Sequence, residues 1–330
     1  MRSPTSFRFI RRLASGFVAL AGLALAVRSH AADAPAPPPT ATELHTVTAT
    51  PLDEEVRVGA NQQPEWTKHH RFSDVEIYVL APWEFSTELG WDASVPDEGD
   101  ATHAVRQEFE LGLPWHSQID YVLREESTEE DGFEVVGHSI EGSVALADWG
   151  TIPLNPAVLF EYTFGVHEPD ELEAKLLLGA ELAPRWHWGL NFAFEQQTGG
   201  DREREIVGSQ ALGYSFLDQR LSVGAELTIG AEEEAEDEES KDARAAQSDA
   251  AEEPGEEEDE WEVVATLGPS VQWRITDELH LAVATLFGLT EASPLVNTFV
   301  SIAYTWDFDD ASKTPSAEEQ RFEPLSNQHR

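Results

Sequence analysis

Acidic side chains recur at every second position in several segments of this sequence. Glu108 and Glu110 are the clearest pair, because they alternate with the apolar residues Phe109 and Leu111. Successive side chains of a β-strand point to opposite faces, so the acids of such a segment share one face. Strands of this kind, closed into a wall with the acids inside, predict a water-filled pore that prefers cations. A lumen filled by salt bridges is the alternative, and alternation leaves both open.

The charged residues on the polar face are the candidate lining of that lumen. Each must be paired or hydrated, because an unpaired buried charge costs several kcal/mol. The predicted lumen-lining residues are Glu84, Glu88, Arg106, Glu108, Glu110, Asp120, Arg124, Glu141, Glu161, Glu173, Lys175, Glu181, Glu195 and Glu226.

Segments of about ten residues with this alternation, separated by turn residues, must position these charges. Twelve such segments are expected, a number between small filled barrels and open porins. The facing of the fourth, fifth and eighth stays open, because they alternate poorly. The expected strands are 84–92, 103–113, 117–125, 136–147, 155–165, 172–182, 187–196, 205–216, 219–229, 261–273, 279–288 and 295–308.

The connections between these segments sort largely by parity. Those after even-numbered segments, such as 114–116, are mostly short, and those after odd-numbered segments, such as 93–102 and 230–260, tend to be longer and polar. A transmembrane barrel with short periplasmic turns and longer extracellular loops has this pattern. The sequence therefore predicts an all-β, antiparallel, up-and-down transmembrane β-barrel of about 12 strands.

Tryptophan gathers at one end of the predicted strands, the end that carries the short turns. Indole rings favour the edge of a bilayer, so this clustering predicts an aromatic girdle in contact with outer-membrane lipid. Core tryptophans of a soluble β domain are the alternative. The expected girdle residues are Trp83, Trp115, Trp149, Trp186, Trp188, Trp273 and Trp306.

Four regions follow from composition. Residues 1–31 resemble a cleaved signal peptide, with a basic start and the apolar run 16–27, which predicts export. Together with the barrel pattern, this predicts a location in the bacterial outer membrane. Residues 32–70 are an Ala/Pro-rich linker and a segment without a clear period, and whether 41–70 plug the tube stays open. Residues 71–308 form the barrel, and 309–330 a polar tail.

The overall charge limits the partners. The chain has a net charge of −42, which argues against nucleic acid as a partner. The chain contains 0 Cys, so no disulfide is expected. No cofactor is expected. The acidic residues 231–260 could loosely associate with Ca²⁺ or Mg²⁺, but they lack the ligand spacing of a fixed calcium loop.

Catalytic motifs are not found in the sequence. His138 and Ser139 are adjacent on one predicted strand, so they point to opposite faces and cannot pair as base and nucleophile. No nucleophile elbow, zinc-binding helix or phosphate-binding loop occurs. The sequence therefore predicts no enzyme and no metal site.

Several phrases resemble a known family of barrels. Residues 108–114 followed by 118–120 resemble the strand–turn–strand of the outer-membrane transporters of the MetA-pathway of phenol degradation. Residues 146–150, 181–186 and 268–273 are similar to uncharacterised barrels of that broad type. The resemblance covers roughly residues 80 to 308 and implies transport, with no binding residues to carry over.

A passive channel or small-solute transporter, with cationic or neutral solutes preferred, is the function that these observations predict. The competing class is a non-conducting structural or surface-interaction barrel that uses the acidic loop 231–260. The oligomeric state and the solute are not fixed by the sequence.

Overall fold

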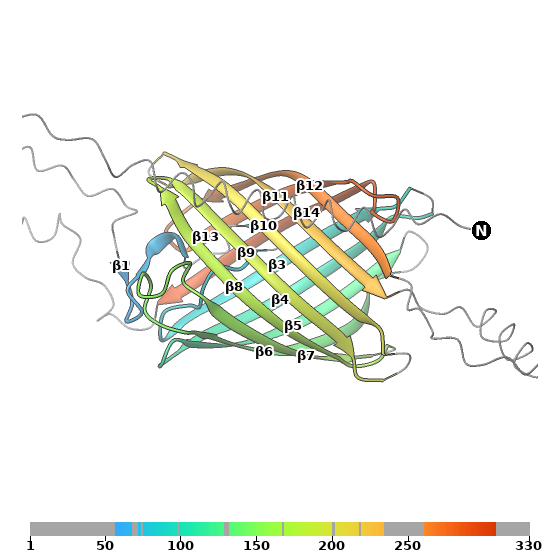
Figure 1. Ribbon diagram of the computed structural model, residues 1–330, viewed down its shortest axis with the longest axis horizontal. Coiled ribbons are helices and arrows are strands. Elements are labelled where there is room, and N and C mark those ends of the chain that lie inside the picture. Colours follow the sequence, from blue (N-terminus) through green and yellow to red (C-terminus); the bar gives the residue numbers. More distant parts are fainter. Residues whose placement is uncertain are drawn as a thin grey trace, which may run out of the picture.

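A closed β-barrel is the core of the computed structural model (Figure 1). The structure describes residues 57–67, 72–73, 75–97, 99–128, 132–166, 168–199, 202–217, 219–233 and 261–307. Twelve antiparallel strands follow one another around the wall, which closes where β14 (Val296–Asp307) pairs with β3 (Glu84–Val95). The predicted twelve-strand up-and-down barrel is confirmed. In the described ranges no helix is long and apolar enough to cross a membrane.

Every predicted strand overlaps one strand of the wall. The strands between β3 and β14 are β4 (Thr102–Leu113), β5 (Ser117–Thr128), β6 (Glu134–Ala145), β7 (Ala157–Gly165), β8 (Glu171–Ala183), β9 (Trp186–Gln197), β10 (Arg204–Phe216), β11 (Leu221–Glu233), β12 (Trp261–Arg274) and β13 (Leu279–Gly288).

The two ends of the barrel differ from the predicted division into short turns and long loops. We call the end with connections 114–116 and 184–185 the turn end, and the opposite end the loop end. At the loop end β3 extends to Val95 and β5 to Thr128, so the connections 96–101 and 129–133 are shorter than predicted, and at the turn end the connection 146–156 is longer than the predicted 148–154. At the rim of the barrel both faces of a strand are in water. Strand pairing therefore continues there without the apolar/polar alternation by which a strand is predicted from sequence.

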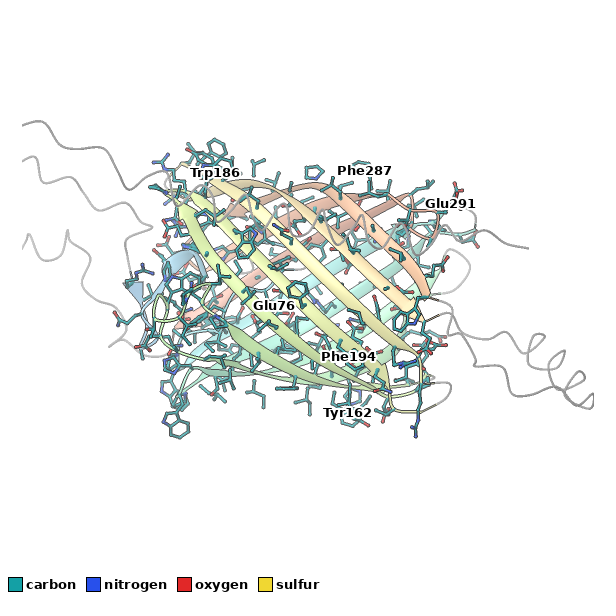
Figure 2. The ribbon with its side chains drawn as sticks, in the orientation of Figure 1. Glu76, Tyr162, Trp186, Phe194, Phe287 and Glu291 are labelled. Atoms are coloured by element: carbon teal, nitrogen blue, oxygen red, sulfur yellow. The ribbon has the colours of Figure 1, made fainter. Side chains whose placement is uncertain are left out.

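The outer surface of the barrel is apolar. Leu89, Phe160 and Leu172 are exposed outward, whereas Glu88 and Ser139 on the opposite face are buried. Figure 2 shows Trp186 and Phe287 pointing away from the wall. A closed barrel with an apolar exterior satisfies every backbone group between strands and places apolar side chains against lipid, so it belongs in the bacterial outer membrane.

A stretch of chain before β3 lies at and inside the barrel. It contains β1 (Arg57–Val58), β2 (Gln63–Pro64) and the 3₁₀ helix η2 (Glu65–Thr67), all at the turn end (Figure 1). Residues 73 and 76 lie at the inner end of this stretch, and residues 77–83 lead back to β3 at the turn end. We call the described residues 57–67, 72–73 and 75–83 the inner segment. The predicted barrel covers 71–308, whereas the wall of the structure lies at 84–307, because residues 75–83 belong to no strand.

Candidate functional site

The inner segment fills the turn-end half of the lumen with a hydrophobic core. Trp66 lies at its centre, with its ring centroid 5.6 Å from that of Trp149 and 4.4 Å from that of His187. The inner segment contributes Trp66, Phe72, Val75, Ile77, Tyr78 and Val79 to this core, and the barrel side contributes Ala145, Trp149, Ala157, Leu159, Leu177 and Ala211. These apolar contacts pack the inner segment against the wall in the turn-end half of the tube.

Polar side chains of the wall bind the backbone of the inner segment. The Ser73 N–H donates to both carboxylate oxygens of Glu226, at 3.2 and 3.0 Å, and the Ser73 hydroxyl donates to the same group. The Leu80 N–H donates to Gln118 Oε1 at 2.6 Å. Because residues 75–83 belong to no strand, these side chains supply the partners that a sheet would otherwise give.

Glycines let the inner segment approach the wall closely. A Cβ at Gly112 would lie 2.0 Å from the Ala81 carbonyl oxygen, and one at Gly179 would lie 2.1 Å from Ile77 Cγ2. Any larger residue at these two positions would collide with the inner segment. The wall is therefore shaped to hold this segment.

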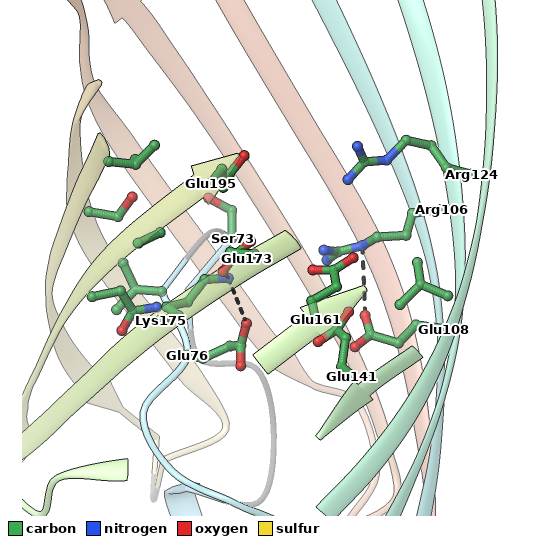
Figure 3. A pocket seen from close by; sticks show the side chains of 16 residues that line it. Ser73, Glu76, Arg106, Glu108, Arg124, Glu141, Glu161, Glu173, Lys175 and Glu195 are labelled. Carbon is green, nitrogen blue, oxygen red and sulfur yellow. Dashed lines mark hydrogen bonds and ion pairs between the residues drawn. The ribbon is translucent and has the colours of Figure 1, made fainter. Parts of the chain in front are cut away.

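The loop-end half of the lumen is charged and contains two cavities. The deeper one, the inner cavity, has a volume of about 170 Å³ and lies beside Ser73 and Glu76 of the inner segment (Figure 3). Eight predicted lining residues meet there: Arg106, Glu108, Arg124, Glu141, Glu161, Glu173, Lys175 and Glu195.

The other predicted lining residues lie away from the inner cavity. Glu181 is opposite His187 in the register of β8 and β9, near the turn end. Five are almost fully buried: Glu84, Glu88, Glu110, Asp120 and Glu226.

Acidic residues face one another across nine consecutive strands. In the register of the sheet each is the direct partner of the next, from Glu110 near the turn end of β4 to Glu262 near the loop end of β12. We call this row the acidic ladder: Glu110, Asp120, Glu141, Glu161, Glu173, Glu195, Glu205, Glu232 and Glu262. Like charges placed directly opposite destabilise a sheet, so packing alone gives no reason for this row.

Three basic side chains line the inner cavity. Arg106 lies 3.3 Å from Glu88 and 3.7 Å from Glu108. Lys175 lies 3.0 Å from Glu173 and 3.4 Å from Glu76 of the inner segment. Arg124 forms no ion pair with any residue that the structure describes.

The second cavity, the outer cavity, opens above the first toward the loop end. Its volume is about 390 Å³, and Ser73, Arg106 and Arg124 line both cavities. One side of it carries Leu286 and Phe299. The outer cavity therefore combines apolar and polar lining on the loop-end side of the inner cavity.

The predicted girdle tryptophans occupy two kinds of position. Five are exposed at the turn end: Trp83, Trp115, Trp186, Trp273 and Trp306. Trp149 and Trp188 are buried instead. Trp149 packs edge-on against Tyr78 of the inner segment, at 5.2 Å between ring centroids, because the connection 146–156 folds toward the lumen.

Two further predictions concern chemistry. His138 stacks on Phe164 at 5.0 Å between ring centroids, whereas Ser139 is buried on the opposite face. Among the described residues, no group of three or more His, Cys, Asp or Glu could hold a metal ion. Residues 234–260 of the acidic loop 231–260, the segment 1–31 and the tail 309–330 lie outside the described residues, whereas 231–233 belong to β11.

Comparison with known proteins supports the fold. No family model and no curated protein matches the sequence. The structure is similar to an outer membrane channel from Pseudomonas putida F1, with a TM-score of 0.51, 10% identity, and coverage of 70% of this chain and 98% of that one. The NanC porin aligns with a TM-score of 0.43 and 7% identity, over 67% of this chain and 98% of the porin chain. The KdgM porin aligns with a TM-score of 0.43 and 8% identity, over 67% of this chain and 99% of the porin chain. The similarity to the first of these shows that the chain has the fold of an outer-membrane β-barrel.

Proposed function

We propose that this barrel is a passive outer-membrane channel for small solutes, and that it prefers cationic or neutral ones. The observation that carries the proposal is the acidic ladder, which winds inside the wall from near the turn end to the loop end. Carboxylates that line a water-filled path attract cations and repel anions.

The position of the charges supports a path rather than a filled lumen. Glu141, Glu161 and Glu195 all line the inner cavity, and none forms an ion pair with a described residue. A salt-bridged filling would neutralise such groups. Because the inner segment fills the turn-end half, we expect the intact protein to conduct weakly.

Reversal potentials in planar bilayers test the proposal. In a KCl gradient the wild-type barrel is expected to pass K⁺ in preference to Cl⁻. The double variant Glu141→Gln/Glu161→Gln should lower the K⁺/Cl⁻ permeability ratio by at least about twofold, because it removes two charges from the path. Glu168→Gln, which removes an exposed acid that lines neither cavity, is the matched control. Anion preference, or no conductance in any variant, contradicts the proposal.

A non-conducting barrel is the second candidate. The hydrophobic core around Trp66 favours it, since this core occupies the turn-end half of the lumen. In that case the acidic loop 231–260 would act at the cell surface. Deleting 231–260 separates the two candidates: a channel keeps its conductance, whereas a surface-interaction barrel loses binding to its surface partner.

We also propose kinship with the outer-membrane transporters of the MetA-pathway of phenol degradation, on the residues 108–114 and 118–120 quoted above. In the structure these residues form the end of β4, the turn and the start of β5, where Gln118 binds the inner segment.

A further inference from the structure

The inner cavity contains charges of both signs, and some of them form no ion pair with a described residue. Of its three basic side chains, Arg106 and Lys175 have acidic partners, whereas Arg124 forms no ion pair with a described residue. On the acidic side, Glu141 and Glu161 form no ion pair with a described residue either. The cavity thus offers a guanidinium and a pair of carboxylates to a third component.

The register of the sheet explains why these opposite charges do not pair with each other. Arg124 on β5 lies opposite Gly137 on β6, and Glu141 is four residues farther along β6. Four residues of strand span about 13 Å. Both side chains nevertheless line the same cavity, with Arg124 on its loop-end side, as Figure 3 shows. A small molecule in this cavity would lie between them, beside Arg106, which lines the same cavity.

The chemistry of these groups defines the molecule that fits. A guanidinium binds a carboxylate through two parallel hydrogen bonds, and carboxylates accept hydrogen bonds from an ammonium group. A cation alone leaves Arg124 unmatched, and an anion alone would face the carboxylates of Glu141 and Glu161. A molecule that carries one group of each sign satisfies both ends of the cavity.

We propose that the inner cavity is a binding site for small zwitterions of the amino-acid type. The carboxylate of the solute binds Arg124, and its ammonium group lies between Glu141 and Glu161. The volume of about 170 Å³ agrees with this size, since a cavity of about 150 Å³ holds a molecule as large as benzene. The inference deepens the proposed channel by naming its solute class, and it rests on the lumen being a solute path.

Ligand-observed NMR on the mature barrel in detergent tests the site without requiring conductance. The probes are 4-aminobutyrate, which carries both charges, and the singly charged analogues butyrate and butylammonium. The wild-type barrel is expected to bind 4-aminobutyrate at least about threefold more tightly than butylammonium, the size expected of one ion pair in a hydrated site. Butyrate should bind more weakly than both.

Substitutions assign each end of the solute. Arg124→Gln should reduce binding of 4-aminobutyrate to the level of butylammonium and leave butylammonium itself unweakened. Glu161→Gln should weaken both ammonium compounds. Arg220→Gln is the matched control, because it removes an exposed guanidinium near the turn end that lines neither cavity.

The outcomes separate the site from the channel. Equal binding of 4-aminobutyrate and butylammonium, or unchanged binding in Arg124→Gln, overturns the zwitterion site whatever the barrel conducts. Selective binding that depends on Arg124, in a barrel without conductance, supports the site and defeats the channel. If Arg220→Gln weakens binding of the probes as much as Arg124→Gln does, the loss comes from the overall charge of the protein and the proposal is overturned as well.

Discussion

The two halves of the lumen are built on one wall but filled differently. In the turn-end half, the inner segment packs Trp66 and Ile77 against apolar and glycine positions of the wall. In the loop-end half, the wall presents acids and arginines to two cavities. Every strand of the wall crosses both halves, so alternation alone does not decide whether a stretch of lumen holds chain or solvent.

The identity of the inward-facing residues makes the difference. Gly112 and Gly179 leave room for another backbone, and Gln118 and Glu226 satisfy its polar groups. In the acidic ladder, by contrast, directly opposed carboxylates such as Glu141 and Glu161 favour water and cations over chain. The turn-end half can therefore be changed while the loop-end half serves as the reference.

Deleting residues 57–81 is expected to have the largest effect. Without the inner segment the turn-end half would be open along its length, so single-channel conductance should rise by about tenfold toward that of an unplugged tube. The K⁺/Cl⁻ preference should remain, because the acidic ladder stays in place. Heat-modifiable migration in detergent reports whether the shortened barrel still folds.

An unchanged conductance in a folded deletion variant would show that the inner segment does not limit passage. Deletion of the tail 309–330 is the control for shortening the chain.

Enlarging a wall glycine should destabilise the turn-end half by a smaller amount. Gly179→Val would drive a side chain into Ile77 and should cost about 1–3 kcal/mol, the usual range for overpacking. Gly142→Val is the control, since a Cβ there has no neighbour within 4 Å. Thermal unfolding in detergent measures both.

The same substitution in the barrel without residues 57–81 sharpens this result. There the cost of Gly179→Val should vanish, because the colliding segment is absent. A cost that persists would place the strain within the wall itself.

The sequence predicts the wall well and its filling poorly. Strand pairing follows from a local rhythm, so β4 and β9 were located to within a residue or two of their ends. The lining acids of the inner cavity follow from the same rhythm. The packing of residues 75–81 inside the tube depends on wall residues far along the chain, such as Glu226.

Signals for the inner segment do exist in the sequence. Glycines such as Gly112 and Gly179 stand at inward positions where small size has no local purpose, and Val75, Ile77 and Val79 alternate before the first wall strand. Neither signal indicates that residues 75–81 pack against the wall at Gly112 and Gly179. For the same reason Trp149 reads as a girdle residue, although its ring packs on Tyr78.

The smallest expected effect is a pH dependence of conductance. It comes from the contact between Tyr78 of the inner segment and the turn-end connection 146–156. Burial, with the charge of Asp148, raises the pKa of Tyr78 from 10.0 to about 12, and the phenol donates to the Ala147 carbonyl oxygen at 2.5 Å. Because the folded pKa lies above the unfolded one, this stabilisation is complete below pH 10 and is lost as the pH rises from 10 to 12.

Conductance should therefore increase over that range as the inner segment loosens. Tyr78→Phe lacks the titrating group, so its conductance should be flat over the same range, and slightly higher than wild type at pH 8 because one hydrogen bond of about 1 kcal/mol is missing. Tyr121→Phe, a change on an exposed outer residue, should behave as wild type. If Tyr78→Phe showed the same alkaline increase, another group that titrates between pH 10 and 12 would release the inner segment, and the role of Tyr78 would be lost.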